Sequence, residues 1–195
     1  MSNNYCSFDY TVAGCRSLKP SSFPNHPKVW WNVGALINEA LVPKPYTGKL
    51  DPFNEDSDEQ IMPEVMSGWC SSLVMREDLL KAFLEAGVDN LQLFDAEITD
   101  PDSGKVYTNY KAVNIVGCIA AADLRKSEYT EHGNGPVIDV DFDKLVIEDK
   151  KPDGTLMFRL AESINVILLH KKVRDHLLTK NFPFLRFYEV GDIAT

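Results

Sequence analysis

The clearest helical pattern in the chain lies between residues 76 and 86. Apolar residues there fall on one face of a helix, namely Leu79, Leu80, Phe83 and Leu84. Gly87 follows directly, at the position where a helix commonly ends in the left-handed conformation. Residues 91–98 then alternate between apolar and polar, as in a half-buried strand. The pattern predicts a helix followed by a strand.

A second copy of this pattern lies near the C-terminus. Residues 73–96 align without a gap with residues 167–190, and Gly87 then matches Asn181. These two residue types best tolerate a left-handed helix end. Each copy predicts a short strand, a helix, a left-handed turn and a strand, although amphipathic units of this kind also resemble one another without a common origin.

Strand patterns account for much of the remaining C-terminal part. Residues 106–124 predict one long strand or two broken strands. Asp139, Asp141 and Asp143 alternate with three apolar residues, so one face of a strand carries three carboxylates. Residues 123–136 read as a polar loop, and residues 156–160 as the return strand of a hairpin.

The first 68 residues are less periodic. A short helix is predicted for residues 29–41 from apolar residues at helical spacing, which are Trp30, Val33, Ile37 and Leu41. Residues 46–59 read as a loop. We therefore expect an N-terminal arm (1–68) and an α+β domain (69–195) that form one compact unit. Its fold should be a mixed, mainly antiparallel sheet with two similar strand–helix–strand units packed against it.

Charge is distributed unevenly along the chain. Its 195 residues include 29 acidic and 20 basic ones, for a net charge of −9. Six acids fall within residues 51–64, called here the acidic stretch, and no Lys or Arg occurs between residues 50 and 75. An acidic balance argues against nucleic acid and anionic membranes as partners, and favours a basic partner.

The sequence contains no recognisable catalytic or metal-binding motif. His26, His132, His170 and His176 lack the spacing of metal ligands, and no nucleophile elbow is present. We expect neither a metal site nor a cofactor. Asp139 and Asp141 could serve as acid and base, so a small cytoplasmic enzyme using strand carboxylates is one alternative function. A non-catalytic scaffold module is another.

Targeting signals are not evident either. The first residues lack the basic start and apolar run of a signal peptide, and no apolar run reaches the roughly 20 residues needed to cross a bilayer. A cytoplasmic location is expected. Reduced thiols are then expected for the cysteines, with Cys70 and Cys118 buried; the four are Cys6, Cys15, Cys70 and Cys118.

Residues 69–190 resemble a bacterial family of polymorphic-toxin immunity proteins, the immunity family numbered eleven and formerly a domain of unknown function. The resemblance rests on six segments in order: SSLVMREDL (71–79), NLQLF (90–94), YKAVNIVGC (110–118), DLRKSEY (123–129), LMFRL (156–160) and FLRFY (184–188). It implies an antidote that binds and blocks a cognate protein toxin. The family has no catalytic residues to transfer, and the toxin's activity and the oligomeric state stay open.

A basic toxin would be attracted by negative charge and held by aromatic side chains. Candidate steering charges are the acids at the start of the acidic stretch: Asp51, Glu55, Asp56, Asp58 and Glu59. Candidate aromatic anchors are Trp30, Trp31 and Tyr46. The alternatives are a solvated charge run and tryptophans that pack in the core.

Overall fold

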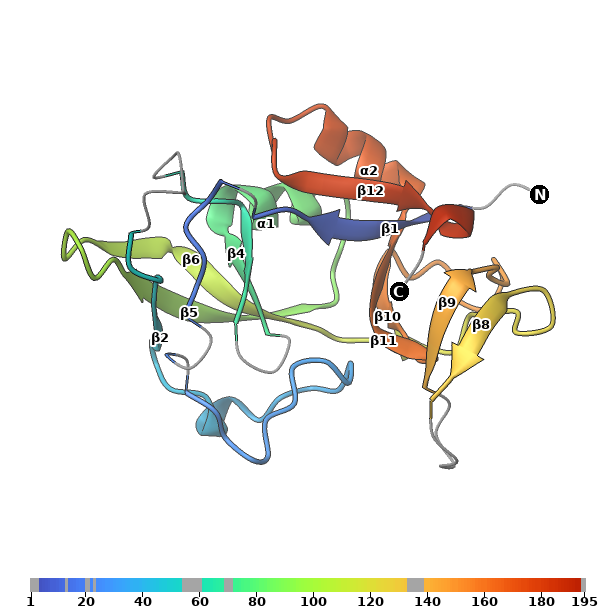
Figure 1. Cartoon of the computed structure of the whole chain (residues 1–195), viewed down its shortest axis with the longest axis horizontal. Helices are drawn as coiled ribbons and strands as arrows, with labels where there is room; N and C mark the ends of the chain where they lie inside the picture. Colours follow the sequence, from blue (N-terminus) through green and yellow to red (C-terminus); the bar gives the residue numbers. More distant parts are fainter. Residues whose placement is uncertain are drawn as a thin grey trace.

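Two five-stranded sheets and a two-stranded ribbon make up most of the structure, with two α-helices lying against the sheets (Figure 1). The structure is a computed structural model, and it describes residues 4–12, 14–19, 22, 24–53, 61–68, 72–132 and 139–193. No helix in these ranges is long and apolar enough to cross a membrane.

One sheet, called here the terminal sheet, contains the first and the last strand of the chain. Its order is β12 (Leu185–Glu189), β1 (Tyr5–Tyr10), β11 (Ser163–His170), β10 (Met157–Leu160) and β7 (Cys118–Ile119). Neighbouring strands are antiparallel except β10 and β7, which are parallel. A short 3-10 turn, η4 (Val190–Asp192), follows β12.

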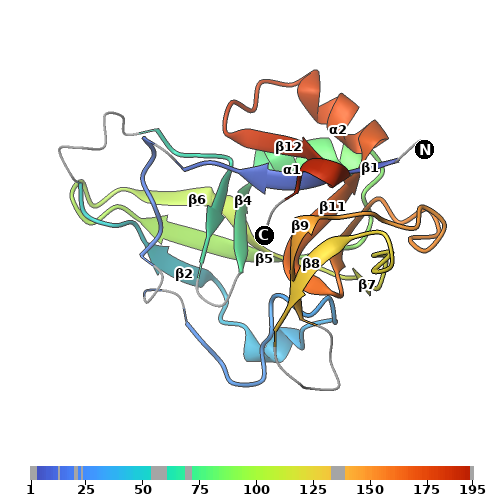
Figure 2. The same cartoon turned by 45° about the vertical axis from the view of Figure 1, so that its right-hand side comes forward.

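The other sheet, the central sheet, has the order β2 (Tyr46–Lys49), β5 (Leu91–Thr99), β6 (Val106–Ile115), β4 (Leu73–Arg76) and β3 (Val65–Ser67). Only β2 and β5 are parallel. The separate ribbon pairs β8 (Glu128–Glu131) with β9 (Val140–Lys144). Figure 2 shows this ribbon in front of the terminal sheet.

Each sheet is linked to one helix. Helix α1 (Glu77–Glu85) connects β4 to β5, and α2 (Lys171–Leu178) connects β11 to β12. In both cases one antiparallel strand, β6 or β1, lies between the two connected strands. Apolar residues of both helices share one core with both sheets, among them Leu79, Phe83, Val173, Leu177, Phe8 and Val113. This shared core joins the two sheets.

The structure confirms the α+β class and the mixed, mainly antiparallel pairing, but the predicted single sheet is wrong because the two repeat segments lie in different sheets. Their similarity as units stays a prediction. Gly87 does take a left-handed conformation (φ +93°), and the next N–H bonds back to Phe83. Asn181 does not, because α2 already ends at Thr179, whose N–H bonds to His176.

Three further predictions are wrong. Residues 29–41 contain only a 3-10 turn, η2 (Glu39–Leu41), because Gly34 interrupts them in the left-handed conformation (φ +70°). Tyr46–Lys49 is not loop but strand β2, which pairs with β5. Strand β10 does not return on β9. Instead β9 pairs with β8, a strand that lies inside the predicted polar loop.

The N-terminal 68 residues do not form a separate arm. Strand β1 lies inside the terminal sheet, between β11 and β12, and β2 and β3 are the two edges of the central sheet. The predicted boundary after residue 68 also falls between β3 and β4, which pair with each other. The sheets therefore combine both halves of the predicted division.

Candidate partner-binding site

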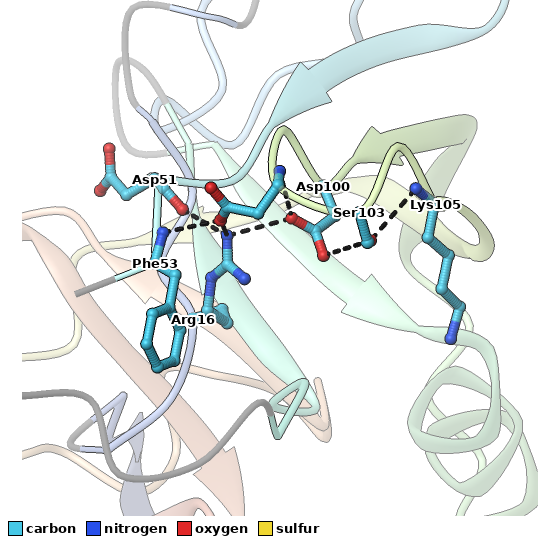
Figure 3. Close-up of polar contacts among 7 residues, drawn as sticks. Arg16, Asp51, Phe53, Asp100, Ser103 and Lys105 are labelled. Carbon is cyan, nitrogen blue, oxygen red and sulfur yellow. Dashed lines mark hydrogen bonds and ion pairs between the residues drawn. The ribbon is translucent and has the colours of Figure 1, made fainter. Parts of the chain in front are cut away.

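A buried arginine fixes the chain where it enters the acidic stretch (Figure 3). Arg16 is 5% exposed, and its Nη2 donates to the main-chain oxygen of Asp51 at 2.6 Å. The same nitrogen lies 3.2 Å from Asp100 Oδ1 and 2.9 Å from Asp102 Oδ2. Arg16 thereby joins three segments of the chain: its own segment after β1, the segment after β2 that contains Asp51, and the turn between β5 and β6 that contains Asp100 and Asp102.

The acceptors around Arg16 are themselves held in place. Asp100 accepts a hydrogen bond from the Ser103 hydroxyl at 2.6 Å, and a second from the N–H of Asp102 at 3.0 Å. The Ser103 bond, with Arg16 as a further cause, lowers the pKa of Asp100 below its usual value. Asp102 also accepts from the N–H of Phe53 at 2.7 Å. Asp100 is therefore charged at neutral pH, and hydrogen bonds orient both carboxylates.

A second arginine fixes the other end of the acidic stretch. The Arg76 N–H donates to the Glu64 carbonyl at 2.9 Å, and its Nη1 donates to the Met62 carbonyl at 3.1 Å. Its Nη2 lies 3.4 Å from Glu64 Oε1, while Asp78 holds Nε at 2.8 Å. Arg16 and Arg76 thus clamp the two ends of the acidic stretch.

The structure locates only part of the predicted steering charge. Asp51 is half-buried and uses its main-chain oxygen in the Arg16 clamp. Glu55, Asp56, Asp58 and Glu59 lie outside the described residues, so their role stays a prediction. Glu64, which is part of the acidic stretch, is 1% exposed and paired with Arg76. It contributes no exposed charge.

Two of the three predicted aromatic anchors are buried, so the prediction is wrong for them. Trp31 is 3% and Tyr46 is 1% exposed, and their rings lie 5.3 Å apart. Trp31 also packs edge-on against Phe94 at 5.5 Å. These rings belong to a core on the central sheet. They stabilise the fold and are not available to a partner.

Trp30 does lie on the surface, and two apolar residues of the same segment are exposed with it: Val33, which the sequence placed on the predicted helix face, and Leu36, which it did not. Trp30 is 61% exposed, Val33 41% and Leu36 76%. We call these three residues the Trp30 strip. A contiguous apolar patch on a protein surface commonly marks an interaction site, so this segment is a candidate for one. Since the segment is not helical, helical spacing could not show which residues face outward.

Side-chain amides attach this segment to the central sheet. Gln92 both donates to the Ile37 carbonyl at 2.8 Å and accepts from the Ile37 N–H at 2.9 Å. Asn114 donates to the Ala35 carbonyl at 2.8 Å. The Gly117 N–H donates to the Gly34 carbonyl at 2.8 Å. The Trp30 strip is therefore presented on backbone that is fixed to the sheet.

The strand carboxylates do not enclose a reaction site. Asp139, Asp141 and Asp143 are all exposed, and Asp141 lies 2.6 Å from His132 Nε2. Within the described ranges no group of three His, Cys, Asp or Glu side chains could hold a metal ion. The geometry gives an acid–base role for Asp139 and Asp141 no support.

The cysteines show no activated thiol among the described residues. Burial raises the pKa of Cys6 to about 11, which keeps it protonated and unreactive. Cys15 is buried, whereas Cys118 is exposed and so corrects the predicted burial. None of these three cysteines forms a disulfide with a described residue, and Cys70 lies outside the described residues.

Comparison with models of protein families gives no match, and comparison with curated proteins gives none either. Neither result identifies a family for the chain. The function must therefore be argued from the geometry of its own residues.

Proposed function

We propose that this protein is an immunity protein that binds and neutralises a cognate, basic bacterial toxin in the cytoplasm. The observation that carries the proposal is the pair of arginine clamps at the two ends of the acidic stretch. The buried Arg16 donates to the Asp51 carbonyl where the chain enters this stretch, and Arg76 donates to the Met62 carbonyl where the chain leaves it. The clamps hold the two ends of the most acidic segment of the chain in place, which suits a segment that meets a partner.

The clamps favour binding by two physical routes. Surface charge of one sign raises the rate at which an oppositely charged partner associates, and salt reduces the effect. Chain ends that are already fixed also lose less conformational entropy on binding than free ends do. Both effects act on a segment that has six acids and no lysine or arginine.

The Trp30 strip is a second surface feature that supports the same function. Charge attracts a partner, but a few apolar and aromatic side chains usually supply most of the binding energy. Trp30 is the exposed tryptophan of the described residues, and Leu36 beside it in the segment is 76% exposed. A toxin that covers both features would be held as well as attracted.

The first test is coexpression with a toxin-like reading frame that neighbours this gene. The proposal expects this protein to restore growth and to copurify with the toxin. Trp30→Ala should weaken the complex by about tenfold or more, as hot-spot residues do. Tyr129→Ala, which removes another exposed aromatic residue, is the control and should leave binding unchanged. Unprotected cells and no complex would contradict the proposed function.

A further inference from the structure

A groove opens in the terminal sheet where β1 separates from β11. The two strands pair only from Tyr5↔His170 to Ser7↔Leu168, whereas β1 stays paired with β12 as far as Tyr10↔Leu185. Figures 1 and 2 both show β1 running away from β11. The first half of β11 therefore has a strand partner on its β10 side and an open edge on its β1 side.

Residues from five elements line the resulting cavity of about 530 Å³, namely β1, β9, β11, β12 and η4. Its polar lining consists of Ser7, Asp9, Asp141, Ser163, Asn165 and Asp192. A neighbouring cavity of about 340 Å³ shares Asp9 and Asn165 with it, is also lined by the buried Arg159, and extends to Ser67, the last residue of β3.

The charge of the 530 Å³ groove is negative. Its lining contains three carboxylates, from β1, β9 and η4, and no lysine, arginine or histidine among the residues described. Asp141 is paired with His132, but Asp9 and Asp192 have no ion-pair partner in the described part of the chain. Arg186 lies opposite Asp9 in the β1–β12 pairing, yet it donates to main-chain oxygens instead.

Two serines with little exposed surface line the same groove. Ser7 is 8% and Ser163 is 7% exposed, and neither hydroxyl makes a hydrogen bond to any described residue. Both residues line the groove, so their hydroxyls can bond to water or to a ligand that occupies it. The two serines sit on the strands that separate and point into the space between them. A ligand with its own hydrogen-bonding groups would satisfy both.

We propose that this groove receives an extended segment of the toxin that carries arginine or lysine. The segment lies along the open edge of β11, where its main chain bonds to the strand, as in other cases of strand addition. Its cationic side chains pair with Asp9 and Asp192, and its polar groups reach Ser7 and Ser163. The inference rests on the proposed function only in naming the protein that supplies the segment.

Charge complementarity and the open strand edge together select this occupant. A nucleic acid would be repelled by three carboxylates. A metal ion would need a tight group of ligands, and none occurs in the described chain. A peptide segment uses both the charges and the free edge, and strand spacing places alternate side chains on the same face.

The test uses the peptide Thr-Arg-Thr-Arg-Thr-Arg-NH₂ with fluorescein coupled to its N-terminal amine, and the full-length protein. Anisotropy measures affinity, and amide NMR shifts locate the peptide. We expect shifts at Ser7–Tyr10 and Ser163–Ile167. The double variant Asp9→Asn with Asp192→Asn should bind about tenfold more weakly or worse, because two charge pairs are lost. Asp143→Asn, an exposed carboxylate of β9 outside the groove lining, should bind like the wild type.

A peptide with proline in place of threonine keeps the charges but loses half of its N–H donors, and it should also bind about tenfold more weakly. Equal binding of both peptides, equal binding by the double variant, or shifts confined to other surfaces would overturn the inference. If the toxin copurifies with the protein but the peptide does not bind, the groove proposal is contradicted and the proposed function is not. If the peptide binds but no complex with a toxin forms, the proposed function is contradicted and the groove proposal is not.

Discussion

The guanidinium of Arg16 lies 3.2 Å from the carboxylate of Asp100, and both side chains are almost completely withdrawn from water. The residues are 84 positions apart, so only the folded chain brings them together. Two buried charges of this kind depend on each other, because the loss of one leaves the other unpaired. This pair fixes the start of the acidic stretch.

Replacing Arg16 by alanine should therefore destabilise the fold. We expect a loss of about 3 kcal/mol in the free energy of unfolding, since Asp100 and the Asp51 carbonyl lose a buried partner. Urea unfolding measures the change. Arg125→Ala is the control, because that side chain is 90% exposed, and it should change stability by less than about 0.5 kcal/mol. Similar effects of the two variants would show that the Arg16 clamp is unimportant.

The lowered pKa of Asp100 predicts a specific dependence on pH. A carboxyl group whose pKa falls on folding stabilises the protein above its unfolded value of about 3.9, and this stability is lost as pH drops through the folded value. Asp100→Asn should thus be less stable than the wild type at pH 7. The difference should shrink below about pH 4, as urea unfolding at several pH values can show. A constant difference would contradict the assigned pKa shift.

Gly34 should tolerate no side chain. A Cβ there would lie 2.6 Å from the Gly117 carbonyl carbon, and the backbone is left-handed with φ +70°. Gly104 has nearly the same φ, +71°, but nothing lies within 4 Å of its Cβ position. Both alanine variants carry the conformational cost of about 1 kcal/mol, and only Gly34→Ala adds a clash. Thermal unfolding should show a clearly lower Tm for Gly34→Ala, and equal Tm values would refute the close contact.

His170 should make stability pH-dependent through the start of α2. Its Nδ1 accepts the Lys172 N–H at 3.1 Å, which requires the neutral ring, and burial with nearby Lys172 lowers its pKa. A histidine with a lowered pKa favours the folded state above its unfolded value of about 6.5, and stability falls with pH below that value. His170→Asn keeps an acceptor without this titration. Its unfolding free energy should depend less on pH between about 7 and 5, whereas parallel curves would rule out the cap as the cause.

Periodic segments were predictable from the sequence because their signal is local. The apolar face of Leu79 and Phe83 and the alternation of Val140 and Phe142 both reflect contacts with a core that lies on one side of the element. Strands β2 and β3 are only 4 and 3 residues long, so their pattern is too short to detect. The pairing of β2 depends on β5, about 50 residues later.

Of the candidate site, the sequence predicted only the part that rests on amino-acid composition, which is the cluster of acids in residues 51–64. The acidic stretch is visible in the sequence, but the clamps are not, because the partners of Arg16 lie 35, 84 and 86 positions away. Adjacent Trp30 and Trp31 give no sign of which one is buried when the backbone is irregular. The groove between β1 and β11 depends on where a pairing ends. These features need the tertiary structure.

The central claim is that the acidic stretch attracts a basic toxin, and the rate of association tests it most directly. Stopped-flow mixing with the toxin would give this rate between about 0.05 and 0.5 M salt, a range in which screening becomes strong. The account predicts a rate that falls with salt, and a variant carrying Asp56→Lys, Asp58→Lys and Glu59→Lys should associate about tenfold or more slowly at low salt. An unchanged rate with the same salt dependence in that variant would contradict the claim.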